Sequence, residues 1–289
     1  MLTVLFGVLA GIGFGLLAVT VRSALARGGD PEVGAIVMGT VALAVDVVLA
    51  AAFGDLGTVH PGDLWPFVLI GALVPGASQI LFIQSVRLAG PSRAAIMIGV
   101  APLVSALLAI AFLGEPIQVG LVIGTVIIVA GGAFLVAEKS RPKEFQAIGM
   151  AIALTCAVMF GIRDNLVREA QTHRHPPPLV AAAASLLGAC LTLLVYLLVV
   201  RRRELRERLR PSLRPFVPAG LTLGAAYAFL VEALAHGRVT IVAPLNATQS
   251  IFAVVFAAII VGRAELIGRR TVIAGLLIVV GGALIGATR

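Results

Sequence analysis

Four polar side chains interrupt long apolar stretches of this chain. Gln79, Tyr227 and Gln249 each lie near the middle of such a stretch, and Asn246 precedes Gln249 by about one helical turn, so the two share a helix face. Amides and a phenol exchange hydrogen bonds with solutes of varied charge and cost less to bury than ions do. We therefore predict that these four residues bind a polar solute, with hydrogen bonding between helices as the alternative role.

A single carboxyl group, that of Asp46, also lies near the middle of an apolar stretch. An ionisable side chain at the centre of a bilayer costs roughly 2.5–3.5 kcal/mol on insertion scales, so its presence requires an explanation. One interpretation is ion coupling, in which the carboxyl group carries a transported proton. The other is a neutral acid that hydrogen-bonds to a neighbouring helix, and the sequence leaves both open.

Arg163, Asp164 and Glu232 form a charged set toward the ends of two further apolar stretches. Consecutive residues on a helix point about 100° apart, so we do not expect Arg163 and Asp164 to satisfy each other. We predict that Arg163 instead pairs with Glu232 across two helices and closes one end of the solute path as a gate. The alternatives are a local pair of Asp164 with Arg168 and an Arg163 side chain that extends to the headgroups.

The elements that must position these residues are membrane helices. Apolar residues make up 60% of the chain and charged residues 12%, a balance that a soluble domain does not have, and the mean hydropathy is +1.07. A membrane helix needs about 20 mostly apolar residues. Such runs occupy residues 2–22, 33–53, 65–87, 93–113, 117–137, 146–168, 178–200, 215–235, 239–261 and 271–288. The sequence therefore predicts an all-α integral membrane protein with about ten transmembrane helices.

Positive charge is concentrated in the loops on one side of this predicted bundle. The net charge is +8, but it lies in short loops and not on a soluble basic face, which argues against a nucleic-acid partner. Of the 22 Lys and Arg residues, 17 follow odd-numbered runs, including the basic stretch 201–214, which we expect to be a solvated loop near anionic lipid. The positive-inside rule then predicts a plasma (inner) membrane protein with both termini outside.

The two halves of the chain resemble each other. Residues of the first half recur in the second at offsets that drift from 146 to 150: Phe14-Gly15 as Phe160-Gly161, Val21-Arg22 as Val167-Arg168, and Glu115 as Glu265. This predicts a repeat of five helices over 1–143 and a second over 144–289. An odd number of helices inverts the second repeat relative to the first, which is typical of secondary transporters.

Short motifs near the end of the fourth and fifth runs of each half carry a family resemblance. They are Ala101-Pro102-Leu103, Leu113-Gly114-Glu115 and Gly131-Gly132 in the first half, and Ala243-Pro244-Leu245, Gly262, Glu265 and Gly281-Gly282 in the second. The chain resembles the ten-helix EamA-type transporters of the drug/metabolite transporter superfamily. The resemblance implies transport of a solute or metabolite, usually export, without ATP. It also implies that both termini lie inside the cell, which conflicts with the charge bias.

The function predicted from these observations is secondary transport, with export of a small polar or amphipathic metabolite by alternating access. The sequence contains no G-x-x-x-x-G-K-[ST], H-E-x-x-H or G-x-S-x-G motif, so we expect no ATP motor, enzyme activity, metal or cofactor. The alternatives are an exporter of hydrophobic drugs or lipid-linked substrates, a non-transporting membrane subunit, and a membrane-embedded enzyme. Monomer and homodimer both stay open.

Overall fold

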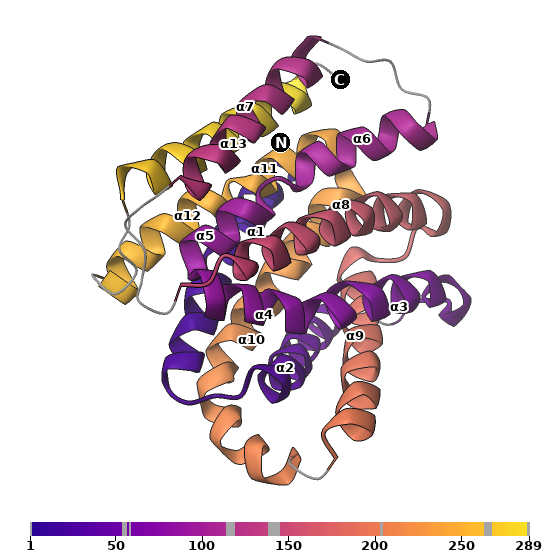
Figure 1. The fold of residues 1–289 in the computed structure, drawn as a ribbon. Coiled ribbons are helices and arrows are strands. Elements are labelled where there is room, and N and C mark those ends of the chain that lie inside the picture. The colour runs from indigo at the N-terminus through magenta and orange to yellow at the C-terminus, as the bar shows by residue number, and fades with distance from the viewer. Residues whose placement is uncertain are drawn as a thin grey trace.

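A computed structural model describes residues 2–53, 57, 59–113, 119–137, 145–202, 205–262 and 268–287, and these residues form helices and no strands (Figure 1). The α-helices are α1 (Leu2–Ala26), α2 (Pro31–Ala52), α3 (Trp65–Gly71), α4 (Ser78–Ala89), α5 (Pro91–Ile98), α6 (Ala101–Leu113), α7 (Val119–Val136), α8 (Ile148–Arg174), α9 (Pro178–Val200), α10 (Leu205–His236), α11 (Val239–Ala247), α12 (Gln249–Phe256) and α13 (Arg269–Ala287). A 3-10 turn, Pro61–Asp63, and two π-helical segments, Ala72–Ala77 and Ala257–Val261, complete the helical structure of the described residues.

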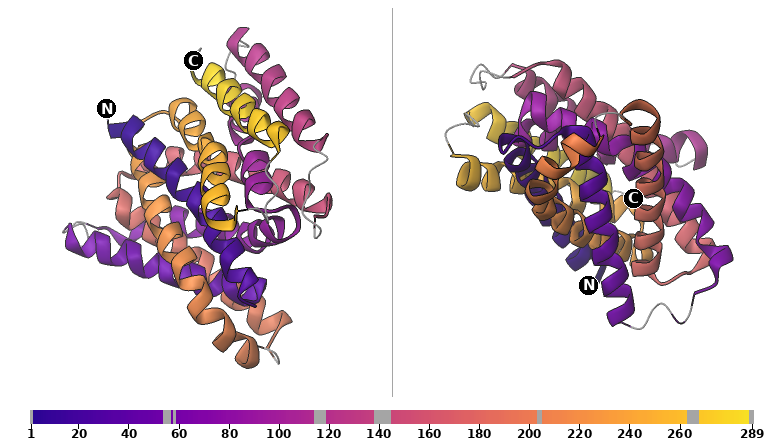
Figure 2. Two further views of the ribbon diagram at one scale, coloured as in Figure 1. Left: turned by 90° about the vertical axis from the view of Figure 1, so that its left-hand side faces the viewer. Right: turned by 90° about the horizontal axis from the view of Figure 1, so that it is seen from below.

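The helices confirm the predicted all-α membrane fold. In the described part of the chain, 7 helical stretches are long and apolar enough to cross a membrane, and Pro91–Ser105 and Val122–Leu135 are shorter apolar helices. Each of the ten predicted runs is occupied by one helix or by consecutive helical segments. The first turn of α1 and the end of α13 lie toward the same end of the molecule (Figures 1 and 2), as an even number of crossings requires.

Two of the runs contain broken helices at corresponding places in the two halves. Helix α5 ends at Ile98 and α6 begins at Ala101, while α11 ends at Ala247 and α12 begins at Gln249. The two broken helices meet at these breaks, where the Ser250 hydroxyl donates a hydrogen bond to the Ala95 carbonyl over 3.1 Å. Broken helices at membrane depth are tolerated where protein surrounds them or where they line a cavity.

The structure shows that the two Ala-Pro-Leu motifs are not equivalent, although the sequence suggested that they were. Pro102 is the second residue of α6, where its missing N–H is not needed. Pro244 lies inside α11, ahead of the second break. The correspondence between the halves at this point is therefore carried by the breaks and not by the prolines.

Contacts between the two halves occur in matching pairs. Helix α2 packs on α9 and α7 on α13, while the packing of α1 on α10 has its counterpart in the packing of α8 on α4. At the α7–α13 contact, a Cβ atom added to Gly124 would lie 2.6 Å from the Gly281 carbonyl oxygen, and one added to Gly281 would lie 2.7 Å from the Gly124 carbonyl oxygen. This reciprocal packing is that of a two-repeat architecture.

The basic stretch 201–214 differs from the prediction of a solvated loop, because α10 begins at Leu205. The helix includes Pro211, Pro215 and Pro218, each of which lacks the N–H that a helix interior uses. Tertiary packing offsets this cost. Ser212 and Phe216 are fully buried, and the Ser212 hydroxyl accepts a hydrogen bond of 3.0 Å from the backbone N–H of Asp30.

Candidate functional site

Arg163 and Asp164 form a buried ion pair within α8. The Arg163 Nε and Nη2 atoms both donate to Asp164 Oδ1, over 2.9 and 2.8 Å, and the two residues are 3% and 1% exposed. The expectation that these neighbours would not satisfy each other is wrong. Their Cβ atoms point in different directions, but the long arginine side chain curves back across the helix surface to reach the carboxylate.

Two aromatic rings surround the Arg163 guanidinium. Its central carbon lies 4.8 Å from the centroid of the Phe160 ring and 5.7 Å from that of the Tyr227 ring. Aromatic faces attract a guanidinium, and more strongly where water is excluded. The ion pair and the rings together account for a charged residue inside an apolar bundle.

The other charged side chains of this region have different partners from those predicted. The Glu232 carboxylate lies 3.5 Å from His236 Nδ1, and Arg163 does not pair with it in this conformation. Arg168 does not pair with Asp164. Its Nη1 atom donates to the carbonyl oxygens of Leu234 and Ala235 over 2.9 and 3.0 Å, which satisfies acceptors at the end of α10.

Tyr227 joins the Arg163–Asp164 pair to helices α2 and α9. Its hydroxyl is buried and makes no hydrogen bond within the described ranges. Ser185 of α9 lies beside it outside hydrogen-bond geometry and donates instead to the Ala181 carbonyl over 3.0 Å. The carboxyl groups of Asp46 and Asp164 lie in the surroundings of the Tyr227 hydroxyl. We call Asp46, Phe160, Arg163, Asp164, Ser185 and Tyr227 the Tyr227 cluster.

Asp46 brings an unpaired acid to the Tyr227 cluster. It is fully buried on α2, and neither carboxylate oxygen has a hydrogen-bond partner among the residues that the structure describes. Buried polar atoms are almost always hydrogen-bonded, and an ionised carboxylate without a partner is costly. The carboxyl group is therefore poised to gain a proton or to bind a donor that the protein itself does not supply.

The three predicted amides are buried but are not joined to one another. Gln79 follows Ser78, whose carbonyl oxygen is 3.9 Å from Cys156 Sγ of α8, while Asn246 and Gln249 flank the break between α11 and α12. Gln79 Nε2 and Asn246 Oδ1 have no partner in the described part of the chain. No hydrogen bond between described residues links these amides to Tyr227, so their shared cavity stays a prediction.

A cavity of about 790 Å³ lies elsewhere, where α1 and α4 end and α2 and α10 begin. Its walls are Arg22, Leu25, Ala26, Gly28, Gly29, Asp30, Pro31, Arg87, Glu207, Arg208 and Pro211. This cavity was not predicted, because from the sequence its three arginines count only as loop charges. The sequence Asp30-Pro31, an N-cap residue followed by proline at the first helical position, does indicate that Asp30 caps α2.

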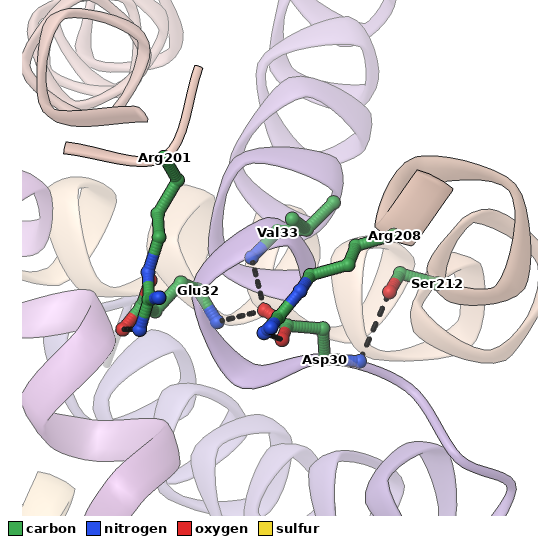
Figure 3. Close-up of polar contacts among 6 residues, drawn as sticks. All are labelled: Asp30, Glu32, Val33, Arg201, Arg208 and Ser212. Atoms are coloured by element: carbon green, nitrogen blue, oxygen red, sulfur yellow. Dashed lines mark hydrogen bonds and ion pairs between the residues drawn. The ribbon is translucent and has the colours of Figure 1, made fainter. Parts of the chain in front are cut away.

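Asp30 lines this cavity, and Figure 3 shows the polar contacts that it makes at the start of α2. Its Oδ1 atom accepts hydrogen bonds from the backbone N–H groups of Glu32 and Val33 over 2.9 and 3.0 Å, and its Oδ2 atom accepts one of 2.6 Å from Arg208. Burial alone would raise the pKa of Asp30, but these hydrogen bonds and the Arg208 charge lower it below the ordinary value of 3.8. A second ion pair, Arg201–Glu32 at 2.7 Å, ties the end of α9 to the start of α2.

Comparison with known proteins places the chain. The model of the EamA-like transporter family matches residues 1–137 and 147–287, once in each half. One similar crystal structure, titled "Crystal structure of protein", superposes on this chain with a TM-score of 0.67 and 20% sequence identity. The match covers 96% of this chain and 95% of the other, which shows a shared fold. No curated protein matches. Because the family model covers nearly the whole chain, the protein belongs to the EamA-like transporter family.

Proposed function

We propose that this protein is a secondary transporter that exports a small polar or amphipathic metabolite across the plasma membrane by alternating access. Membership of the EamA-like transporter family supports membrane transport. One observation carries the substrate class: Asp46 and Gln79 in the first half, and Tyr227 and Asn246 in the second, bury polar atoms that have no described partner.

These unpartnered atoms offer complementary chemistry. The Asp46 carboxylate and the Asn246 carbonyl accept hydrogen bonds, the Gln79 amide nitrogen donates, and the Tyr227 hydroxyl does both. Two other buried groups without a described partner, on Gln171 and Thr271, lie in terminal turns of their helices. A ligand with both donors and acceptors satisfies the first set, which favours a polar metabolite over a purely hydrophobic drug.

In the proposed mechanism, the solute binds between the halves and the halves then rock about it. The breaks at Gly99 and Thr248 place irregular backbone beside each other, as transporter sites often do. Asp46 carries the coupling proton, because its carboxyl group has no permanent partner to stabilise the ionised form. We propose that Arg163 pairs with Glu232, and so closes the gate, only in a second conformation in which Arg163 has left Asp164.

The test begins with purified protein and a panel of metabolites screened for thermal stabilisation, since a ligand stabilises the state that it binds. For each ligand that raises the midpoint of thermal unfolding, the flux across the membrane of proteoliposomes is then measured. Tyr227→Phe, which removes only the buried hydroxyl, should weaken both stabilisation and flux, and Tyr196→Phe is the matched control. Flux without any partner protein would exclude a non-transporting subunit. Stabilisation by hydrophobic drugs alone would contradict the proposed substrate class.

A further inference from the structure

Asp46 and Tyr227 lie at a close contact between the two halves of the chain, where α2 of the first half packs along α10 of the second. Two glycines of α10 allow this approach, because a Cβ atom added to either would lie 2.9 or 3.0 Å from a carbonyl oxygen of α2: Gly220 beside Met38 and Gly224 beside Ala42. The next turn of α2 carries Asp46, and the next turn of α10 carries Tyr227. The two side chains therefore join the parts that rock in the proposed mechanism.

The charge of the Tyr227 cluster is not balanced when Asp46 is ionised. Arg163 and Asp164 neutralise each other at 2.8 Å, while Asp46 has no hydrogen-bond partner among the described residues and is fully buried. A neutral solute could donate hydrogen bonds to the Asp46 carboxylate, but it would leave one buried negative charge without a counter-ion, which is costly. The cluster is therefore completed by a ligand group that carries one positive charge.

A primary ammonium group matches the hydrogen-bonding atoms at this place. It has three donors and no acceptor, and Asp46 and Tyr227 offer oxygens that accept hydrogen bonds and have no described partner. Ser185 adds a third acceptor beside Tyr227, because its hydroxyl donates its own hydrogen to a backbone carbonyl and keeps its lone pairs. The close packing at Gly224 favours a compact group, so a primary ammonium suits this place better than a trimethylated one.

We propose that Asp46 and Tyr227 bind a primary ammonium group of the transported solute, and that this group bridges the two halves through α2 and α10. The inference rests on the proposed transport function, because it defines by charge the solute of the same site. The coupling proton and the ammonium group both neutralise the Asp46 carboxylate, so they occupy it at different steps of the transport cycle.

The test uses purified full-length protein in detergent, and follows the thermal unfolding midpoint during titration with butylammonium and with phenethylammonium. Each probe is compared with the alcohol of the same shape, butanol or phenethyl alcohol, and butylammonium also with butyltrimethylammonium. Only the two primary ammonium probes should raise the midpoint in a saturable way. Asp46→Asn should weaken their binding by about tenfold or more, because a charge-assisted hydrogen bond is lost. The matched control is Asp63→Asn, a partly exposed acid outside the Tyr227 cluster, which should bind within about twofold of the unmodified chain.

Several outcomes would overturn the ammonium site. They are the lack of stabilisation by both primary ammonium probes, equal stabilisation by the alcohols, by butyltrimethylammonium or by sodium chloride at the same concentration, and equal binding by Asp46→Asn and its control. If Asp46→Asn does not fold, Tyr227→Phe repeats the test with Tyr196→Phe as the control, and should weaken binding by about threefold through the loss of one neutral hydrogen bond. Asp46→Asn keeps an oxygen acceptor, so it should still exchange solute when the solute concentration is raised to match its weaker binding.

Failure of the ammonium site and failure of transport give different results. A primary ammonium probe that binds through Asp46 but does not cross the membrane of proteoliposomes would contradict the transport proposal and leave the site standing. Flux of neutral polar solutes, with no binding of either ammonium probe, would contradict the site and leave transport standing.

Discussion

Asp30 and Arg208 are joined by a hydrogen bond of 2.6 Å that links the first residue before α2 to the first turns of α10. The same carboxylate caps α2 through its other oxygen. One side chain therefore fixes a helix start in the first half and holds the second half against it. Loss of the Asp30 side chain should therefore weaken both the start of α2 and its contact with α10.

We predict that Asp30→Ala lowers the stability of the protein by about 1–2 kcal/mol, the usual cost of a lost N-cap, with a smaller loss from the ion pair. The measurement is the thermal unfolding midpoint in detergent. Asp63→Ala is the control, because its partner Arg174 lies 3.6 Å away and both side chains are partly exposed. Equal unfolding midpoints for the two variants would show that the Asp30 cap stabilises the protein no more than the partly exposed Asp63–Arg174 pair does.

The contribution of Asp30 should also depend on pH in a defined direction. Its pKa is lowered in the folded protein, so the stabilisation is fully present above the unfolded value of 3.8 and is lost as pH falls through the lower folded value. The difference in midpoint between the unmodified chain and Asp30→Asn should therefore be constant between pH 5 and 7, as ~3.8 lies below that window. It should shrink only below pH 3.8. A difference that grows on acidification would contradict the hydrogen-bond geometry.

Arg163 and Asp164 should behave as a coupled pair. Removing one partner leaves a buried charge without its counter-ion, which costs roughly 3–5 kcal/mol, whereas removing both leaves no such charge. We therefore expect Arg163→Met and Asp164→Leu each to unfold the protein more readily than the double variant does, as measured by the midpoint and by the folded yield in membranes. Additive losses would refute the pair. Coupling of Arg163 to Glu232 in transport assays alone would reveal the gate in a second conformation.

Asp46→Asn tests proton coupling while the volume of the side chain is preserved. If the carboxyl group carries the proton, the variant should lose solute accumulation driven by a pH gradient by about tenfold, yet still exchange labelled for unlabelled solute. Both are measured as fluxes in proteoliposomes, with Asp63→Asn as the control. Unchanged accumulation in the Asp46 variant would assign coupling to another group.

The orientation of the chain can be tested directly. The charge bias of 17 to 5 predicts that a reporter fused after Arg289 reads as outside the cytoplasm, and that one inserted after Arg202 reads as inside. A cytoplasmic signal from the first fusion, with an outside signal from the second, would reverse the orientation and agree with the family resemblance instead. The fold would be unaffected.

Most of the fold was predictable because hydrophobic length alone marks a membrane helix, as in Leu2–Ala26 or Pro178–Val200. The start of α10 was not, since Pro211 and its basic neighbours look like a loop until the packing of Ser212 and Phe216 is known. The burial of Gln79, Asn246 and Tyr227 followed from their apolar surroundings. The pairing of charged side chains could not be predicted in the same way, as Arg163 shows. Residue spacing determines neither the rotamer of a side chain nor its neighbours on other helices.

Helix α10 spans 32 residues, about 48 Å at the usual rise, and so exceeds the roughly 30 Å hydrocarbon layer. Its basic end carries Arg208, and Tyr227 lies about five turns further on. Between them, Pro211, Pro215 and Pro218 each remove one hydrogen bond of the ladder, so bending concentrates there. The three prolines therefore weaken the hydrogen-bond ladder of α10 between its basic end, which the Asp30–Arg208 pair holds, and the segment that carries Tyr227.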